Sequence, residues 1–510
     1  MGHVKNRNVK TLRPFLFHKK PIRLSRNEFN FFDHSADIDQ IGWNPKKYEK
    51  LWIYNLHYFD CLNDSSSTKS NFKDDLYIIH KWINENVNFH GVGWDPYPTS
   101  LRIVNWVKWS INNNYIDEKI MKSINLQTEW LFKRMEWHLL GNHLFANAKA
   151  LLFSYFFLDG KNSDKWLTLG LEILTKELQE QILADGGNFE LSPMYHGIFL
   201  EDLLDIINIS SSGLNFLNAD KVNELKKYSK KMIDWMNVMS HDDGQISFFN
   251  DSAFGISPTV KQLTKYAKSF GIEISSGVDH FIHLKDSGYI KLKNDNVSSI
   301  LDVGKIGPDY LPGHAHADSL AFELSYKNNR IFVNGCTSTY EIGKKRIKQR
   351  STLSHNTVEI NNKNSSDIWS SFRVGKRAKT FDLKINHKIG CSSVSCSHDG
   401  YTSFKNSIIH NREWTLKENN FQIIDKISGR YNSATGTYIL HPNVKIIKNN
   451  SKNYLLLLPD GTELGLDISS ESNLIDFSFY EYFGCNEIKT NAIRVNILSG
   501  YNICTLKWKN

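Results

Sequence analysis

The spacing of apolar residues changes once along this chain of 510 residues. From about residue 74 to residue 270 the spacing is mostly helical, and Leu101, Val104 and Val107 belong to one apolar stripe. After about residue 285 the spacing has a period of two, with Gly, Asn and Ser turns between short apolar runs. Helices and strands in separate blocks indicate two domains of different class rather than one α/β sheet.

The chain is too long for a single hydrophobic core, so we expect two large domains. The predicted division is a basic, irregular N-terminal arm at residues 1–45, a helical domain at 46–275 and a strand-rich domain at 285–510. Strands are expected at residues 289–292, 319–326, 330–333, 357–360, 421–427 and 503–508.

The composition is that of a soluble globular protein, with 40% hydrophobic and 23% charged residues. The formal net charge of +8 favours an anionic partner such as a polysaccharide. We expect no nucleic-acid partner, because the chain has no dense Lys/Arg block and no nucleic-acid motif. The densest apolar run, residues 151–158, is too short to span a bilayer.

The first eight residues contain no apolar run, so we expect no signal peptide and a cytoplasmic location. A periplasmic or exported location stays open as the alternative. The sequence carries no feature that indicates an oligomeric state.

A loop rich in titratable groups precedes one of the expected strands. It contains His314, His316 and Asp318, whose side chains would point the same way if the backbone were extended. A rigid scaffold that holds such groups in a loop can present acid–base or metal-binding chemistry. The alternative is a solvent-exposed loop with incidental histidines.

Two further segments carry candidate site residues. Asn142 and His143 lie at the expected start of a helix, where the alternative is a capping Asn followed by a buried, hydrogen-bonded His. His355 lies in residues 350–358, where the alternative is an edge strand with an exposed His. The segment Asn250-Asp251 is interpreted as a turn rather than a calcium loop.

A Gly-rich loop at residues 185–190 delivers Glu190, Tyr195 and His196 to the start of the next helix. The alternative here is a buried Tyr hydrogen-bonded to the backbone. Trp369 either packs at the edge of a sheet or stacks on a sugar ring.

Together these segments resemble the heparinase II/III-like polysaccharide lyases, and also oligoalginate lyases of similar design. The resemblance covers residues 95–380 and, more loosely, the rest of the chain, and residues 314–318, 350–358 and 192–196 are its most specific parts. It implies an incomplete α/α toroid followed by an antiparallel β-sandwich, which agrees with the change of spacing. The aromatic segment 52–60 resembles members encoded with bacterial surface-polysaccharide genes.

The resemblance implies a lyase that cleaves a uronic-acid-containing acidic polysaccharide by β-elimination, linked to a bacterial surface or capsule. Such a site must neutralise the uronate carboxylate, remove the C5 proton and protonate the departing O4. By the resemblance, Asn142 and His143 bind the carboxylate. Tyr195 is the catalytic acid, and also the base when the geometry is syn. His314 is the base for the other uronate epimer.

The residues implied to contact the substrate are Glu190, His196, Arg350 and Trp369. A Tyr with an ordinary pKa of about 10 needs nearby cations to act as a base. His196 and Arg350 are the expected cations beside Tyr195.

Relatives with a structural zinc ion hold it with a His, an Asp and a second His. His316 and His355 match the two histidines, whereas the Asp position is occupied here by Asn334. A neutral amide is a poorer zinc ligand than a carboxylate. Three outcomes stay open: zinc binds weakly, zinc uses Asp318 instead, or zinc is absent.

Two other functions compete with the lyase. A glycoside hydrolase on the same scaffold would need two acidic residues, for which Glu190 with Asp185 or Asp318 are the candidates. A non-catalytic glycan-binding or assembly protein is favoured by Asn334 and by the expected absence of a signal peptide.

Overall fold

The computed structural model describes residues 4–7, 12–16, 23–63, 72–87, 89–211, 214, 216–275, 279–403 and 407–509. The chain forms two compact units. The helical unit comprises Met1–Ile182, Gly197–Ile233 and Lys261–Ile274, and the sheet unit comprises Leu183–His196, Asp234–Val260 and Ser275–Asn510. The predicted boundary between the helical and the strand-rich domain is a single cut near residue 275. In the structure, two segments from the predicted helical domain, Leu183–His196 and Asp234–Val260, group with the sheet unit. Residues 276–278 of the expected junction lie outside the described residues.

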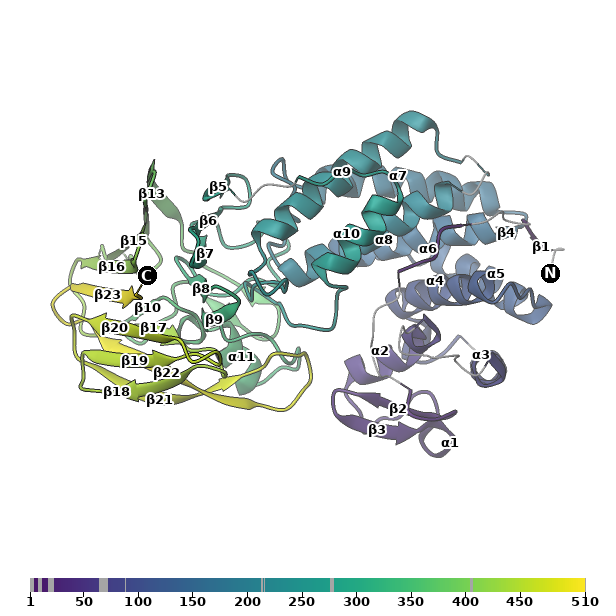
Figure 1. The fold of residues 1–510 in the computed structure, drawn as a ribbon. Coiled ribbons are helices and arrows are strands. Elements are labelled where there is room, and N and C mark those ends of the chain that lie inside the picture. Colours follow the sequence, from purple (N-terminus) through teal and green to yellow (C-terminus); the bar gives the residue numbers. More distant parts are fainter. Residues whose placement is uncertain are drawn as a thin grey trace. The chain divides into compact units, whose positions relative to one another are not determined.

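Long helices fill the region where helical spacing was found (Figure 1): α2 Lys50–Tyr58, α3 Phe72–Glu85, α4 Pro96–Asn112, α5 Glu118–Phe132, α6 Gly141–Phe157, α7 Ser163–Gln181, α8 Pro193–Ser210, α9 Ala219–Val238 and α10 Val260–Ser269. Val104 and Val107 of the predicted stripe are buried in α4. α6 is buried along almost its whole length, as expected for a helix that is apolar all round. None of the helices in the described part of the chain has the length and apolarity to cross a membrane.

Part of the N-terminal arm is regular, which differs from the predicted irregular arm. Strands β2 (Glu28–Phe31) and β3 (His34–Asp37) pair as a hairpin, and the short helix α1 (Ile38–Ile41) follows. Both residues of the two-residue turn have positive φ, which suits the twist of a tight hairpin. Phe31 packs edge-on against Trp52, with ring centroids 5.2 Å apart. Residues 1–3, 8–11 and 17–22 of the arm lie outside the described residues.

The sheet unit contains three antiparallel sheets and a two-stranded ribbon, drawn from green to yellow in Figure 1. The five-stranded sheet holds β5 Phe281–Leu284, β6 Tyr289–Lys293, β7 Val297–Asp302, β8 Phe322–Tyr326 and β9 Asn329–Phe332. The eight-stranded sheet holds, in spatial order, β13 Thr380–Lys388, β14 Cys391–His398, β15 Ile409–Lys417, β16 Asn420–Ser428, β23 Tyr501–Lys507, β20 Glu463–Ile468, β19 Asn453–Leu457 and β18 Lys445–Lys448.

The four-stranded sheet orders β10 Val358–Ile360, β17 Ala434–Ile439, β22 Ile488–Asn496 and β21 Ser472–Phe479, and the ribbon pairs β11 Ile368–Trp369 with β12 Arg373–Val374. Each predicted strand segment coincides with an observed strand. The strand predicted from residue 319 begins only at Phe322, because Leu320 has φ +60°, which is incompatible with an extended chain.

One hydrophobic cluster joins the three sheets into a sandwich. Phe322 of β8 lies 6.1 Å from Phe421 of β16 and 6.3 Å from Tyr438 of β17, measured between ring centroids. Leu320, Phe322, Leu324 and Tyr326 all belong to this cluster. The core of the sandwich therefore begins at the end of the His314–Asp318 loop.

A buried ion pair lies inside the sandwich. Arg412 of β15 and Asp425 of β16 face each other in register, with Arg412 Nε 2.7 Å from Asp425 Oδ1. His410 Nε2 lies 2.8 Å from the same oxygen. Burial alone would raise the pKa of Asp425, but Arg412 and the His410 hydrogen bond hold this pKa below its usual range. Asp425 is therefore an ionised carboxylate that compensates a buried guanidinium.

Replacement of Asp425 by Asn should lower the free energy of unfolding by about 3 kcal/mol, because Arg412 would keep a buried charge without its counterion. Chemical denaturation measures this loss. Asp467→Asn is the control, since the Asp467–Lys507 pair is largely exposed, and it should cost about 0–1 kcal/mol. Equal losses in the two variants would contradict the role given to Asp425.

Candidate active site

The first turn of α8 places Tyr195. Ser192 precedes the helix, and its Oγ accepts the backbone N–H of Tyr195 at 3.2 Å, as an N-terminal cap does. Ser192 Oγ also lies 2.6 Å from the carbonyl of Asp251. Leu191, just before the cap, has φ +59°, a conformation rare for a Leu and typical of strained functional loops. The Gly-rich loop therefore delivers Tyr195 to a helix start, as predicted.

Asp251 is the centre of the site. Its carboxylate lies 2.8 Å from His314 Nδ1 and 2.8 Å from His316 Nε2, with one oxygen for each histidine. Both terminal nitrogens of Arg346 donate hydrogen bonds to this carboxylate, and that of Nη2 is 2.7 Å long. Thr337 Oγ1 donates a further hydrogen bond of 2.9 Å. One buried carboxylate thus fixes two histidines and a guanidinium.

The charge of Asp251 determines which nitrogen of His314 is available. Burial alone would raise the pKa of Asp251, but Arg346 and the hydrogen bonds from both histidines hold this pKa well below its usual range. An ionised carboxylate only accepts hydrogen bonds, so His314 carries a hydrogen on Nδ1. His314 Nε2 is left for a proton transfer, and it lies 3.7 Å from Glu190 Oε2.

Tyr195 and His314 are in direct contact. Their rings stack with centroids 3.9 Å apart and planes at 29°. The hydroxyl of Tyr195 lies 2.9 Å from the hydroxyl of Tyr340, and the guanidinium carbon of Arg346 lies 5.0 Å from the Tyr340 ring. Burial raises the pKa of Tyr340 well above its usual value, so Tyr340 stays protonated and can hold a hydrogen bond to Tyr195.

His316 and His355 form a second pair behind His314. His355 Nδ1 lies 2.8 Å from the carbonyl of Ser351, which can only accept, so this nitrogen carries the hydrogen. By the same reasoning, His316 carries its hydrogen on Nε2, toward Asp251. The two remaining nitrogens, His316 Nδ1 and His355 Nε2, lie 3.0 Å apart, a distance at which a proton or another cation is needed between them. This arrangement suits a cation shared by two imidazoles.

The third predicted zinc ligand does not complete the set. Asn334 Oδ1 accepts the backbone N–H of Asn356 at 3.2 Å, and the buried Asn334 Nδ2 has no hydrogen-bond partner in the part of the chain that the structure describes. Burial raises the pKa of Asp318 to about 7, and burial together with the nearby Asp318 charge raises the pKa of Asp302 well above its usual value. Within the described ranges, no group of three His, Cys, Asp or Glu side chains could hold a metal ion. The two imidazoles fit a metal, whereas no carboxylate joins them.

Two residues predicted to contact substrate are buried instead. His196 Nδ1 accepts the backbone N–H of Asn188 at 3.1 Å, and its ring stacks on Trp235 at 4.4 Å. Arg350 donates two hydrogen bonds to the carbonyl of Ala315, at 2.9 and 3.1 Å. Both side chains have no exposed surface. The hydrogen bonds of these side chains go to the backbone instead of to a ligand: His196 fixes the loop before Tyr195, and Arg350 fixes the loop that carries His314.

The remaining predicted residues are placed as follows. Glu190 is buried beside His314, and Trp369 is half exposed on β11. Asp185 Oδ2 accepts the backbone N–H groups of residues 286 and 287 at 2.9 and 2.7 Å, so Asp185 closes a turn. Asp318 lies with Asp302. Asp185 and Asp318, the two candidate partners of Glu190 in a hydrolase, therefore interact with other groups: Asp185 with a backbone turn and Asp318 with Asp302.

Asn142 and His143 lie in the helical unit, in the first turn of α6. The N-terminal cap of α6 is Leu140, so the alternative in which Asn142 caps the helix is wrong. His143 Nδ1 lies 3.0 Å from Glu136 Oε1, and the Tyr97 ring lies 4.4 Å from the His143 ring. The His143 side chain keeps 31% of its surface exposed. It is thus oriented by a carboxylate and still open to solvent.

The sequence reasoning missed Asp251, Tyr340 and Arg346. Asp251 was interpreted as part of a turn, and its neighbour Asn250 does have the positive φ of a turn residue, at +55°. The apolar run before Asn250 was the available signal, since it brings this turn into a buried position. Tyr340 and Arg346 lie close to the predicted segment 350–358 but carry no motif of their own.

Comparison with known proteins supports the predicted family. Residues 19–273 match the family described as heparinase II/III N-terminus, and residues 277–494 match heparinase II/III-like, C-terminal. A heparin-sulfate lyase of Bacteroides stercoris is 26% identical over 59% of this chain and 45% of its own length. A heparin-sulfate lyase of Pedobacter heparinus is 22% identical over 79% of this chain and 67% of its own length. The chain thus spans about half of the first relative and two thirds of the second.

Among solved structures, the crystal structure of heparinase III is similar with a TM-score of 0.73 at 16% identity. The match covers 92% of this chain and 79% of that protein. This likeness confirms the predicted fold, a helical toroid followed by an antiparallel β-sandwich.

Replacement of Asp251 by Asn should lower the free energy of unfolding at pH 7 by about 3–5 kcal/mol, because Arg346 would lose its buried counterion. The pKa of Asp251 is lower in the folded than in the unfolded protein. Its stabilising effect is therefore present above about pH 4 and is lost as the pH falls through the folded pKa. Denaturation at several pH values should show the difference between wild type and variant narrowing below about pH 4.

Asp309→Asn is the control for this experiment, because Asp309 is fully exposed. It should unfold like the wild type at every pH. A variant at Asp251 that also unfolds like the wild type would refute the central role of this carboxylate.

Proposed function

Because the chain belongs to the heparinase II/III family, we propose that it is a polysaccharide lyase that cleaves a uronic-acid-containing glycan by β-elimination. The observation that carries this proposal is the stacked Tyr195–His314 pair, with His314 oriented by Asp251 and the Tyr195 hydroxyl by Tyr340. The heparin-sulfate lyases among the relatives support a glycosaminoglycan as the substrate class.

In the proposed reaction, the C5 proton of the uronate leaves to a base, the C5 electrons form the C4=C5 double bond, and the C4–O4 bond breaks. His314 Nε2 takes the proton when it lies on the face opposite to O4. Tyr195 protonates O4, and it also takes the C5 proton when both lie on the same face. Asn142 and His143 neutralise the uronate carboxylate, which stabilises the charge that develops at C5.

The cation that assists Tyr195 is Arg346 rather than His196 or Arg350. The guanidinium of Arg346 lies against the Tyr340 ring. Its positive charge would stabilise a phenolate at Tyr195. Tyr340 can donate a hydrogen bond to the Tyr195 oxygen when Tyr195 has lost its proton. Both groups favour the ionised form of Tyr195, which a proton-transferring phenol must reach.

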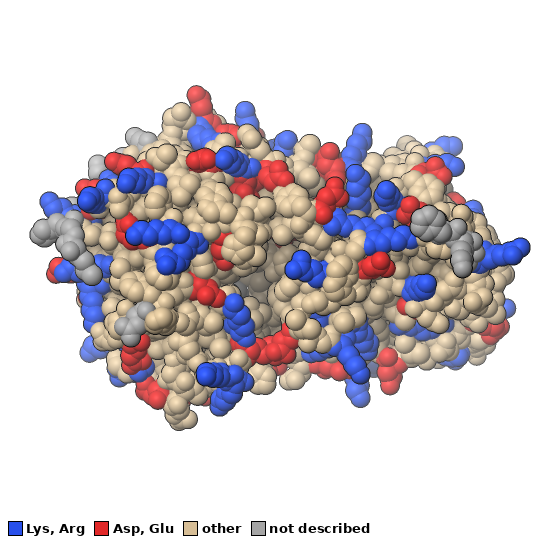
Figure 2. Space-filling model, turned by 180° about the vertical axis from the view of Figure 1, so that it is seen from behind, with Lys and Arg blue, Asp and Glu red and all other residues tan. Residues whose placement is uncertain are grey.

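The natural substrate is proposed to be an anionic polysaccharide of a bacterial surface or capsule. The net charge of +8 supports an anionic polymer. Figure 2 shows Lys and Arg side chains interspersed with Asp and Glu over the face drawn. An excess of positive charge distributed in this way would attract a long polyanion without a single high-affinity patch.

We also propose that a zinc ion is held by His316 Nδ1 and His355 Nε2. The 3.0 Å approach of these nitrogens supports this, as do the hydrogen bonds that the other ring nitrogen of each histidine makes to Asp251 and to the carbonyl of Ser351. The metal, when bound, would supply a fixed positive charge that holds the two loops together. Asn334 adds no charge, so binding should be weaker than in a site with a carboxylate.

Incubation with heparan sulfate and other uronate glycans should raise the ultraviolet absorbance, because elimination creates a conjugated 4,5-unsaturated uronate. Tyr195→Phe should lower kcat by about 10²-fold or more, since it removes the proton that O4 needs. Tyr340→Phe should lower kcat about tenfold through the loss of one hydrogen bond. Tyr501→Phe, at an exposed position, is the control and should keep full activity.

New reducing ends without the absorbance rise would overturn the lyase in favour of a hydrolase. Full activity in Tyr195→Phe would overturn the role of Tyr195 while leaving elimination in place.

Untagged protein should contain zinc by elemental analysis. His355→Ala should lose this zinc, because one of the two imidazole ligands is removed. Asn334→Asp should retain zinc longer during dialysis against a chelator, because a carboxylate adds charge to the site. Protein that is free of zinc, and whose melting temperature does not respond to added zinc, would contradict the proposal.

A further inference from the structure

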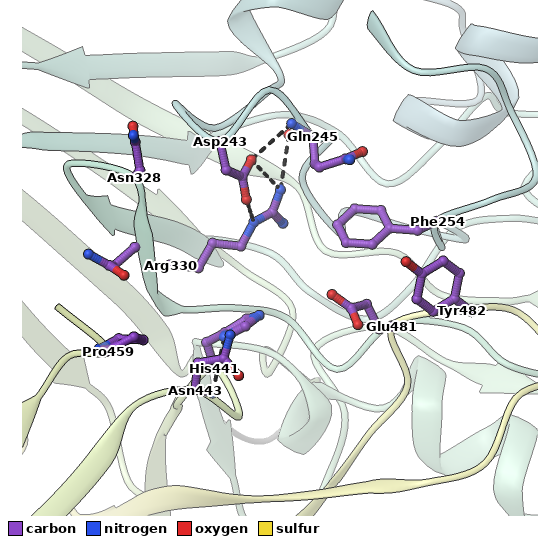
Figure 3. Close-up of a pocket in the computed structure, with 11 residues that line it drawn as sticks. Asp243, Gln245, Phe254, Asn328, Arg330, His441, Asn443, Pro459, Glu481 and Tyr482 are labelled. Atoms are coloured by element: carbon purple, nitrogen blue, oxygen red, sulfur yellow. Dashed lines mark hydrogen bonds and ion pairs between the residues drawn. The ribbon is translucent and has the colours of Figure 1, made fainter.

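A polar pocket lies in the sheet unit, outside the cluster of Tyr195 and His314. Its volume is about 210 Å³. The walls come from the start of β9, from the segment after β17 and from the segment after β21, and Arg330, His441, Glu481 and Tyr482 are among the lining residues. Figure 3 shows the Asp243–Arg330 pair in this pocket, with Phe254, Glu481 and Tyr482 to one side.

Arg330 brings an unsatisfied donor to this pocket. Its Nε lies 2.7 Å from Asp243 Oδ2, and its Nη2 donates to Asp243 Oδ1 and to the carbonyls of Gln245 and Ile246. Among the described residues, Arg330 Nη1 has no hydrogen-bond partner, and the side chain is 2% exposed. The guanidinium carbon lies 5.1 Å from the ring centroids of Phe248 and Phe254. A buried donor without a partner costs free energy, which a ligand that supplies an acceptor would recover.

The charges of the pocket disfavour an anion. Asp243 neutralises Arg330, and Glu481 adds a second carboxyl group whose pKa is raised by burial. His441 adds no positive charge at neutral pH, because burial lowers its pKa to about 4. A ligand that accepts a hydrogen bond from Arg330 and donates one to Glu481 would match these two lining groups. A hydroxyl group does both.

An aromatic surface completes the pocket. Tyr482 is 46% exposed, and the Phe254 ring supports it edge-on, with ring centroids 5.9 Å apart. Such a ring can pack against the C–H face of a sugar while its hydroxyl stays in water. The volume is below that of pockets for drug-sized ligands, so it suits one sugar ring rather than a chain segment.

From the free Arg330 donor, the Glu481 carboxyl group and the exposed Tyr482 ring, we propose that this pocket binds one neutral sugar unit of a glycan. This site is separate from the cleavage site. Binding here requires no proton transfer by Tyr195, so the proposal does not depend on the lyase function.

Ligand-observed saturation-transfer NMR on the full chain tests this, with glucose, galactose and N-acetylglucosamine as neutral probes. Glucuronate and glucosamine are the charged probes. At least one neutral sugar should receive saturation, and Tyr482→Ala should weaken its binding about tenfold. Tyr482→Phe should bind like the wild type, since it keeps the ring. Glu481→Gln should weaken binding, because it removes an acceptor for a sugar hydroxyl.

Tyr501→Ala is the matched control, because Tyr501 is also an exposed Tyr of the sheet unit, at 42%, and does not line the pocket. It should bind like the wild type. The proposal is overturned if no neutral sugar receives saturation, if Tyr482→Ala binds that sugar as tightly as the wild type, or if only glucuronate or glucosamine binds. Because no probe is cleaved, a failure here leaves the lyase proposal untouched.

Discussion

The carboxylate of Asp251 is the interaction on which the site depends. It accepts hydrogen bonds from His314, His316, Thr337 and Arg346, which lie 63 to 95 residues away along the chain. In a buried position a charge without partners is very costly, so these groups must all be in place when the protein is folded. The same requirement gives His314 a single orientation and a single tautomer, which a proton-transferring imidazole needs.

The sandwich core supports this arrangement through a second buried guanidinium. Arg412, held by Asp425, donates to the carbonyl of Leu320 at 2.9 Å and to that of Asn356. These carbonyls follow the His314–Asp318 loop and His355, respectively. Packing in the sandwich and orientation in the site are therefore connected by hydrogen bonds from the Arg412 side chain to these two carbonyls. The strained Leu191 is held separately, because its carbonyl accepts hydrogen bonds from Asn250 Nδ2 at 2.9 Å and from the Tyr289 hydroxyl at 3.1 Å.

The sequence predicted most of the fold and part of the site. The period of apolar residues predicted the helical and strand-rich regions, because burial imposes that period along a local segment. Asp251 was missed because its partners are distant in sequence and a turn has no periodic pattern. His196 and Arg350 were predicted to contact the substrate. The sequence of a motif does not distinguish a polar side chain that faces a ligand from one that hydrogen-bonds to the backbone. Only the three-dimensional structure shows their burial.

One carboxylate, that of Asp251, orients both histidines of the loop that carries His314 and His316. Asp251 orients His314, whose side chain is 14% exposed, with one oxygen, and His316, which is 1% exposed, with the other. A substitution at Asp251 must therefore change the tautomer of the exposed histidine and the packing of the buried one together. The proposed proton transfer by His314 and the stability of the site therefore cannot vary independently. Variation in substrate preference is expected instead at groups outside this network, such as Trp369 on its two-stranded ribbon.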